Sequence, residues 1–345
     1  MRGRVRGRFD VGAFGLGGLG VLAFSVTLPA TRVAVPVFGP WTVGIGRAVI
    51  AAALAGLALR LVPSPRPVGA EWRSLVVAAA GGVLGFPVFS ALAMGHVPAT
   101  RGAVVIGLLP AATAVYATVR GGERPSPAFW AAAGAGLVAV LAFVASTGAG
   151  LRPQPGDVLL LGAVVSAATA YGEGGRLARR LGGWQTICWA LLVALPVTVP
   201  GALVAVVAHG TVDPTPTSVL AFAYVAAVSM LLGFFAWYAG LARGGVASVS
   251  QVQLAQPVLT LVWSWAFLGE RVTTATLVAA AAVLACVALT RRTAVTAAPT
   301  PTPVPVRTSP PSPGATVVAA TSVPSPGAPG TPARTDGSPA ATPAA

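Results

Sequence analysis

Four polar side chains in the second half of the chain recur at intervals of three and four residues. They are Gln253, Gln256, Thr260 and Ser264, and each lies in an otherwise apolar run. This spacing places them on one face of a helix. Amides and hydroxyls arranged in this way can line a cavity and hydrogen-bond a solute, or they can join two helices. Both interpretations stay open from the residues alone.

Charged residues inside apolar runs are the second set of candidates, because a charge at a bilayer centre costs about 2.5–3.5 kcal/mol on insertion scales and normally marks function. Arg47 could attract a substrate carboxylate, or it could cap carbonyls or extend to the surface. Glu173 could bind and release a proton. Arg176, three residues later, instead suggests an ion pair at a helix end. Gly172 and Gly174 favour a close approach by another group.

The composition shows what kind of chain positions these residues. Of the 345 residues, 55% are hydrophobic and only 9% are charged, and the mean hydropathy is +0.80. A soluble domain carries about 25% charged residues, so this chain has too few to cover a surface that faces water. Cys188 and Cys286 lie inside apolar runs, which argues against a disulfide framework or a zinc site. We expect no cofactor and no metal.

Ten apolar runs are long enough to cross a bilayer, which takes roughly 20 residues in a helix. Backbone polar groups in lipid must be paired internally, and continuous Ala, Val, Leu and Gly runs favour helices over a barrel. We therefore predict an all-α membrane protein. Its ten transmembrane helices are expected at residues 11–31, 41–59, 74–95, 102–119, 125–151, 158–172, 181–208, 214–242, 244–269 and 272–290.

The basic residues predict the orientation. All 22 are arginines, they produce a net charge of +14, and they lie at the ends of the runs instead of in one patch, so no nucleic-acid partner is expected. With the N-terminus in the cytoplasm, the segments on that side hold 15 arginines and the opposite segments hold 4. Cytoplasmic loops carry the arginine excess. We therefore expect a multi-pass protein of the cell membrane with both termini cytoplasmic.

Two terminal segments differ from the apolar runs. Residues 1–9 form a basic N-terminus that we place in the cytoplasm. Residues 293–345 are rich in Pro, Thr and Ala and have almost no large apolar side chains, so they cannot bury enough surface to offset their chain entropy. We predict a disordered cytoplasmic tail.

A shift of 147 residues superimposes the two halves of the chain, residues 10–150 and 155–292. The matches are Asp10 with Asp157, Pro110 with Pro257, and Gly122-Glu123-Arg124 with Gly269-Glu270-Arg271. Each half is expected to hold five spans, an odd number, so the halves must be inverted relative to one another. Inverted repeats place a binding site near the midplane between the halves. Pro110 and Pro257 each remove a helix hydrogen bond and predict kinks that move.

Three stretches resemble the EamA group of the drug/metabolite transporter superfamily. They read FSVTLPATRVAVPVFGPWTVGIGRAVIAA, GGERPSPAFW and VASVSQVQLAQPVLTLVWSWAFLGERV. The resemblance covers residues 10 to about 290 and implies ten helices, an inverted five-plus-five repeat, and gradient-driven efflux or exchange of small metabolites. In this family the first, third and eighth helices help to line the central cavity, which draws attention to Phe24, Phe86, Phe89, Trp237 and Tyr238.

We therefore expect a secondary transporter, an exporter of small organic metabolites or amino-acid-like solutes that works by alternating access. Glu173 is the candidate for proton coupling. The expected substrate contacts are Gln253, Gln256, Thr260, Tyr238, Trp237, Phe24, Phe86 and Arg47.

Two other classes of protein stay open. A membrane enzyme would need a carboxylate cluster for Mg²⁺ or a catalytic His/Ser set, and the eight acidic residues never stand together. A membrane scaffold would dock a partner through the tail. Besides the solute and the bilayer, a second copy of the chain in a homodimer is the partner considered.

Overall fold

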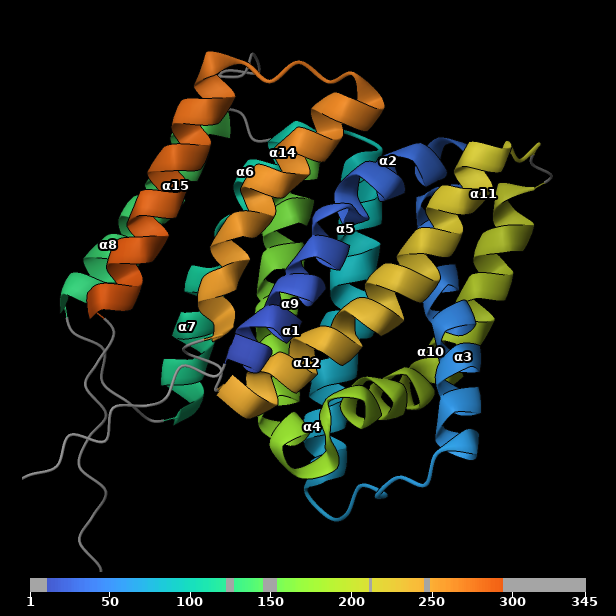
Figure 1. The fold of residues 1–345 in the computed structure, drawn as a ribbon. Helices are drawn as coiled ribbons and strands as arrows, with labels where there is room; N and C mark the ends of the chain where they lie inside the picture. Colours follow the sequence, from blue (N-terminus) through green and yellow to red (C-terminus); the bar gives the residue numbers. More distant parts are fainter. Residues whose placement is uncertain (1–10, 122–126, 145–153, 211–212, 245–248, 294–345) are drawn as a thin grey trace, which may run out of the picture. The chain divides into compact units, whose positions relative to one another are not determined.

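The computed structural model describes residues 11–121, 127–144, 154–210, 213–244 and 249–293, which are helical apart from short turns (Figure 1). The first half comprises α1 (Val11–Ser25), α2 (Thr27–Phe38), the π-helical η1 (Thr42–Gly46), α3 (Arg47–Leu61), α4 (Glu71–Ala78), the π-helical η2 (Ala79–Gly85), α5 (Phe86–Met94), α6 (Ala99–Ile106), α7 (Leu109–Gly121) and α8 (Pro127–Val144).

The second half has fewer interruptions. It comprises α9 (Pro155–Leu181), α10 (Gly183–His209), α11 (Pro216–Ala223), the π-helical η4 (Tyr224–Leu232), α12 (Gly233–Gly244), the 3-10 turn η5 (Ser250–Leu254), α14 (Ala255–Leu268) and α15 (Thr274–Thr293). The predicted N-terminal segment, the tail after Thr293 and the Gly122-Glu123-Arg124 motif lie outside the described residues.

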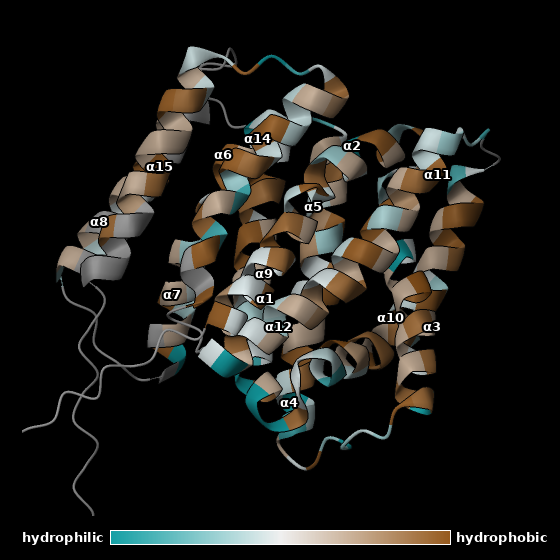
Figure 2. Ribbon diagram, viewed as in Figure 1, coloured by the Kyte–Doolittle hydropathy of each residue, from teal (hydrophilic) through white to brown (hydrophobic). Residues whose placement is uncertain are grey.

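Seven segments in the described part of the chain are long and apolar enough to cross a membrane. They are Val11–Phe38, Thr42–Leu61, Glu71–Met94, Ala99–Ala117, Pro155–Leu181, Gly183–His209 and Pro216–Gly244. Hydrophobic residues run along the helices and hydrophilic ones gather at the ends and in the loops (Figure 2). Large apolar side chains such as Val207 and Leu220 are 81% and 72% exposed, as expected of helices that face hydrocarbon. The protein is an all-α, multi-pass membrane protein.

Two of the remaining three predicted spans are shorter than expected within the described residues: the apolar segment Val252–Leu268 and α8, which has 18 residues. The third, α15, has the expected length of 20 residues, although its apolar stretch is described as Thr274–Cys286. In the ninth span, the 3-10 turn η5 replaces the first α-helical turn. Conversely, the first span continues beyond the predicted residue 31 to Phe38, because the side chain of Arg32 donates to the carbonyl of Met94 and so has a partner.

The helices of the two halves pack in the pairs that a two-fold repeat requires. The 147-residue shift relates α1 and α2 to α9, α3 to α10, α5 to α12, α7 to α14, and α8 to α15. The packing of α1 on α12 therefore has its counterpart in the packing of α9 on α5, whereas α3 packs on its own equivalent α10 and α8 on α15. The described residues belong to one compact unit.

Small residues allow the helices to approach closely at these contacts. A Cβ atom added to Gly240 on α12 would lie 2.9 Å from the backbone nitrogen of Gly17 on α1. Helices in membranes associate through such small residues because lipid supplies no hydrophobic driving force between them. The α1–α12 contact sets the position of the residues that follow on both helices.

Candidate functional site

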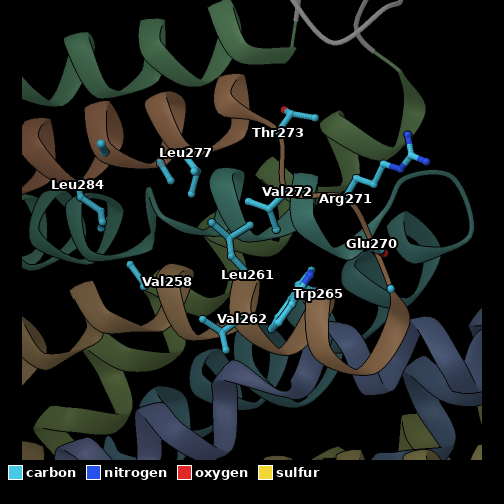
Figure 3. A pocket seen from close by; sticks show the side chains of 13 residues that line it. Val258, Leu261, Val262, Trp265, Glu270, Arg271, Val272, Thr273, Leu277 and Leu284 are labelled. Atoms are coloured by element: carbon cyan, nitrogen blue, oxygen red, sulfur yellow. The ribbon is translucent and has the colours of Figure 1, made fainter.

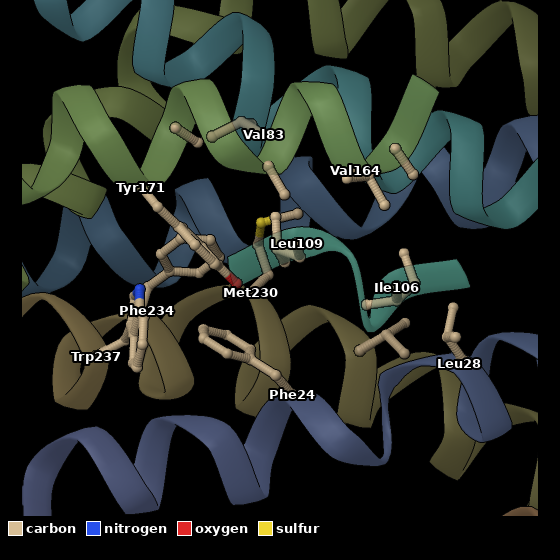
Figure 4. Packing of buried hydrophobic residues seen from close by; sticks show 14 of the residues in the cluster. Phe24, Leu28, Val83, Ile106, Leu109, Val164, Tyr171, Met230, Phe234 and Trp237 are labelled. Atoms are coloured by element: carbon tan, nitrogen blue, oxygen red, sulfur yellow. The ribbon is translucent and has the colours of Figure 1, made fainter. Parts of the chain in front are cut away.

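A small enclosed cavity lies about halfway along the helices, between the two halves. Its volume is about 20 Å³, which is room for about one water molecule. Both halves contribute to the lining, which consists of Phe24, Thr27, Arg47, Gly82, Phe86, Pro87, Ala167, Tyr171, Ser229, Met230, Phe234 and Gln256. The packing around this cavity is shown in Figure 4.

The aromatic wall of the cavity follows the repeat. Tyr171 lies 147 residues after Phe24, and Phe234 lies 148 residues after Phe86. The ring centroids of Phe24 and Phe234 are 5.0 Å apart, and those of Phe24 and Tyr171 are 6.2 Å apart. The rings of Phe24, Tyr171 and Phe234 come together in Figure 4. Phe24 and Phe86 were predicted from the sequence, whereas Tyr171 and Phe234 could have been found by applying the shift to them.

Three π-helical turns adjoin the cavity. The turn η1 ends directly before Arg47, η2 contains Gly82 and ends before Phe86, and η4 contains Ser229 and Met230. A π-turn inserts a residue into the helix and redirects the side chains that follow, and such turns are frequent at functional sites. The wider turns thus direct side chains from three helices at one point.

Arg47 is the charged group of the cavity. It is 1% exposed, and its Nη2 donates to Ser90 Oγ over 3.3 Å, while its Nε has no hydrogen-bond partner within the described part of the chain. None of the ion pairs among the described residues includes it. Of the two interpretations of Arg47, the buried position excludes a side chain that extends to the surface.

Neutral polar groups complete the lining. The hydroxyl oxygens of Thr27 and Ser229 are hydrogen-bonded to each other at 2.7 Å. The Oε1 atom of Gln256 is buried and accepts no hydrogen bond from any residue that the structure describes. Among the residues that line the cavity there is no carboxylate. The site therefore offers a guanidinium, an amide and two hydroxyls against an aromatic wall.

The other members of the predicted polar stripe lie outside the lining. Thr260 donates its hydroxyl hydrogen to the carbonyl of Ser25 at 2.8 Å, so it joins α14 to α1. Ser264 bonds within its own helix, to the carbonyl of Thr260. Gln253 is 1% exposed, and both polar atoms of its amide lack partners. The residues on this helical face therefore have different roles: Gln256 lines the cavity, whereas Thr260 hydrogen-bonds to the neighbouring helix.

Trp237 and Tyr238 also lie behind the lining. The rings of Trp237 and Tyr171 are 5.3 Å apart, and the Tyr238 hydroxyl donates to the carbonyl of Ala170 at 3.0 Å. They hold α12 against α9 and so support Tyr171. Phe89, the remaining aromatic candidate, contacts the position of Gly162 and does not line the cavity.

Glu173 lies in an ion-pair network at one end of the bundle. Its carboxylate accepts from the Tyr116 hydroxyl at 2.7 Å, from Arg120 Nε at 3.1 Å, and from Arg176. The ion pair with Arg176 that the spacing suggested is present. The flanking glycines admit two rings: a Cβ at Gly172 would overlap Tyr116, and one at Gly174 would overlap Tyr238.

A different set of contacts joins the helices at the opposite end. Arg101 and Asp157 form a buried pair with two bonds, of 2.7 and 2.8 Å. The carboxylate of Glu270 accepts from the backbone nitrogens of Ala99 and Thr100 at 2.9 and 2.8 Å, and so caps α6. No such role was predicted for Glu270 from the sequence, although the repeated Gly-Glu-Arg motif pointed to this residue. Gly269 ends α14 at a φ of 64° and positions it.

Both predicted kinks coincide with helix interruptions. The helix stops at Ile106 and resumes at Leu109, directly before Pro110. In the second half, η5 ends at Leu254, and Pro257 lies in the first turn of α14. A Cβ at Gly107 would lie 3.4 Å from the ring of Pro257, so the two interruptions are neighbours.

A larger groove of about 800 Å³ lies between α14 and α15 (Figure 3). Its wall is mostly apolar and includes Val262 and Trp265, which are 45% and 65% exposed. Glu270 at its end is already bonded to α6. This groove has the character of a surface that faces lipid, so the central cavity is the better candidate despite its size.

Known proteins resemble this chain over most of its length. A model of the EamA-like transporter family matches residues 13–145 and 154–292. The uncharacterized transporter YdeK of Bacillus subtilis (strain 168) is 44% identical over 276 residues, which cover 80% of this chain and 96% of that protein. A probable terminal-alkyne amino-acid exporter of Streptantibioticus cattleyicolor is 25% identical over 254 residues, 73% of this chain and 84% of that protein.

One solved crystal structure has the same arrangement of helices. It superimposes with a TM-score of 0.58 at 21% sequence identity and covers 80% of this chain and 95% of the other. At this level of identity the similarity shows the fold.

Proposed function

Because the chain belongs to the EamA-like transporter family, which consists of transporters and not enzymes, we propose that it exports small organic metabolites or amino-acid-like solutes. The observation that supports this most is the enclosed cavity between the halves, lined at equivalent positions by both. A cavity of about 20 Å³ is too small for such a solute. The halves must therefore separate on one side to admit it and on the other to release it, which is alternating access.

The proposal includes the topology. Ten spans in two inverted halves, residues 10–150 and 155–292, account for the packing pairs and for the shift that relates each helix to its equivalent. The arginine excess places both termini in the cytoplasm. With this orientation Glu173 lies toward the cytoplasm and Glu270 toward the outside. A homodimer stays a prediction.

We assign the solute contacts to the lining. Arg47, Gln256, Phe24 and Phe86 contact the solute directly. Gln253, Thr260, Trp237 and Tyr238 lie outside the lining and reach the solute only when the halves move. The interruptions before Pro110 and Pro257 supply the hinges, because the backbone there lacks regular α-helical hydrogen bonds.

Glu173 is the proposed site of proton coupling. A carboxylate held by two arginines stays ionised, so it would take up a proton only after the halves part and the arginines withdraw. Two of its partners are well exposed, Arg120 at 58% and Arg176 at 41% of the side chain, which leaves them free to move.

Everted membrane vesicles test both parts of the proposal. Vesicles that contain the chain should accumulate labelled amino acids faster than vesicles without it, and an uncoupler should abolish the difference. Glu173→Gln should remove the effect of the uncoupler while leaving exchange of solute across the membrane. Accumulation that resists the uncoupler in the unmodified protein would exclude proton coupling, and equal accumulation in both vesicle preparations would exclude export.

A further inference from the structure

Two arginines are fully buried among the described residues, Arg47 and Arg101, and of these two Arg47 has no counter-ion there. Arg101 pairs with Asp157, and Arg120 and Arg176 pair with Glu173. Arg47 is 1% exposed, yet among the described residues its one hydrogen bond is to the Ser90 hydroxyl, at 3.3 Å. A guanidinium carries five N–H donors, so most of its donor capacity is unused.

An unpaired buried charge is unfavourable, and arginine cannot escape by releasing a proton. The compensating charge must therefore arrive with whatever enters the cavity. A carboxylate fits best, because its two oxygens match the planar donor fork of arginine and form two parallel hydrogen bonds.

The rest of the lining limits what else the solute can carry. No carboxylate lines the cavity, so a net cation would meet Arg47 without any compensating charge. The free Oε1 of Gln256 can accept one hydrogen bond, as from an ammonium or a hydroxyl group. Phe24, Phe86 and Phe234 provide an apolar wall.

We propose that Arg47 is the anion-binding residue of the central cavity and that the transported solutes are small carboxylates with an apolar body, including zwitterions but not net cations. This proposal rests on the proposed function in that it names the substrate class of the same site. Binding and flux are separate readouts, so the two proposals can fail separately.

The test measures the thermal stability of the purified full-length chain in detergent with matched probes. For each of several side chains, the L-amino acid, its N-acetyl derivative and its carboxamide are added at equal concentration. The amide retains the side chain and lacks the carboxylate. In at least one series we expect the acid and the N-acetyl acid to raise the melting temperature, and the amide to bind at least about tenfold more weakly.

Two pairs of variants locate the effect. Arg47→Gln should abolish the stabilisation by carboxylates, and Arg47→Lys should retain part of it. Ser90→Asp places a carboxylate beside Arg47, so it should raise the melting temperature without ligand and abolish the response to carboxylates. Ser90→Asn introduces an uncharged side chain of the same size as Asp. It should neither raise the melting temperature without ligand nor abolish the response to carboxylates. If Arg47→Gln fails to fold, the two Ser90 variants still test whether carboxylates bind at Arg47.

Three results would overturn the assignment: amides that bind as well as acids, no response to any carboxylate, or an undiminished response in Arg47→Gln or Ser90→Asp. Carboxylate binding without flux of these probes in proteoliposomes would count against the proposed transport function while leaving the anion site intact.

Discussion

At equivalent positions the two halves of the chain carry similar rings but different polar groups. Phe24 and Phe86 of the first half have Tyr171 and Phe234 as their counterparts, and all four line the cavity. Arg47 instead corresponds to Ala194, and Gln256 corresponds to Leu109. In the proposed transport cycle, a matched wall would let the cavity open by similar movements on either side of the membrane. Each polar group occurs once, so in that cycle it would have to bind the solute in both states.

The largest expected effect is on stability. It comes from giving one half the side chain of the other at a position where there is no room for it. Thr27 lines the cavity, whereas its counterpart Gly174 is covered by the ring of Tyr238. Gly174→Thr should lower the melting temperature of the purified protein strongly, because overpacking costs typically about 1–3 kcal/mol. The matched control is Gly15→Thr, since nothing lies within 4 Å of a Cβ at Gly15. Equal melting temperatures would contradict the close approach of α9 and α12.

An intermediate effect, on solute flux, is expected from replacing the Gln256 amide, which has no polar counterpart in the first half. Gln256→Leu introduces the residue that the first half has at this position and removes the free Oε1 acceptor. We expect a loss of solute flux of roughly two- to tenfold, in line with about 0.5–1.5 kcal/mol for one hydrogen bond. The reciprocal Leu109→Gln should not increase flux in the same vesicle assay. A gain there would mean that the halves are interchangeable in solute binding.

The smallest effect is expected from exchanging the matched rings. Phe24→Tyr combined with Tyr171→Phe keeps two six-membered rings stacked at the cavity wall, where they are 6.2 Å apart. Solute flux should stay within about twofold, because the exchange keeps both rings and the one hydroxyl at the wall, and swaps that conserve volume are tolerated best. A much larger loss would show that the Tyr171 hydroxyl contributes to solute binding in its own right.

Local sequence patterns drew attention to one residue of the cavity lining and to one close contact between helices. Arg47 was recognisable because a charge within an apolar run is rare, and it lies in the cavity wall. The Gly172-Glu173-Gly174 segment predicted a close approach, and Tyr116 and Tyr238 provide it. In contrast, Ser90 and Ser229 were not identified, because isolated serines in apolar helices carry no spacing signal.

The membrane class, the helical segments and the repeat could be predicted from the sequence, because hydropathy and periodicity are properties of neighbouring residues along the chain. Which polar groups face the cavity became clear only from the packing of the helices. Gln253, Gln256 and Thr260 share a helical face, yet Gln256 lines the cavity while Thr260 bonds to α1. Which side chains reach the cavity depends on the rotation of the helix after η5 and on the helix that lies opposite each turn. The spacing of the residues along the sequence does not specify either.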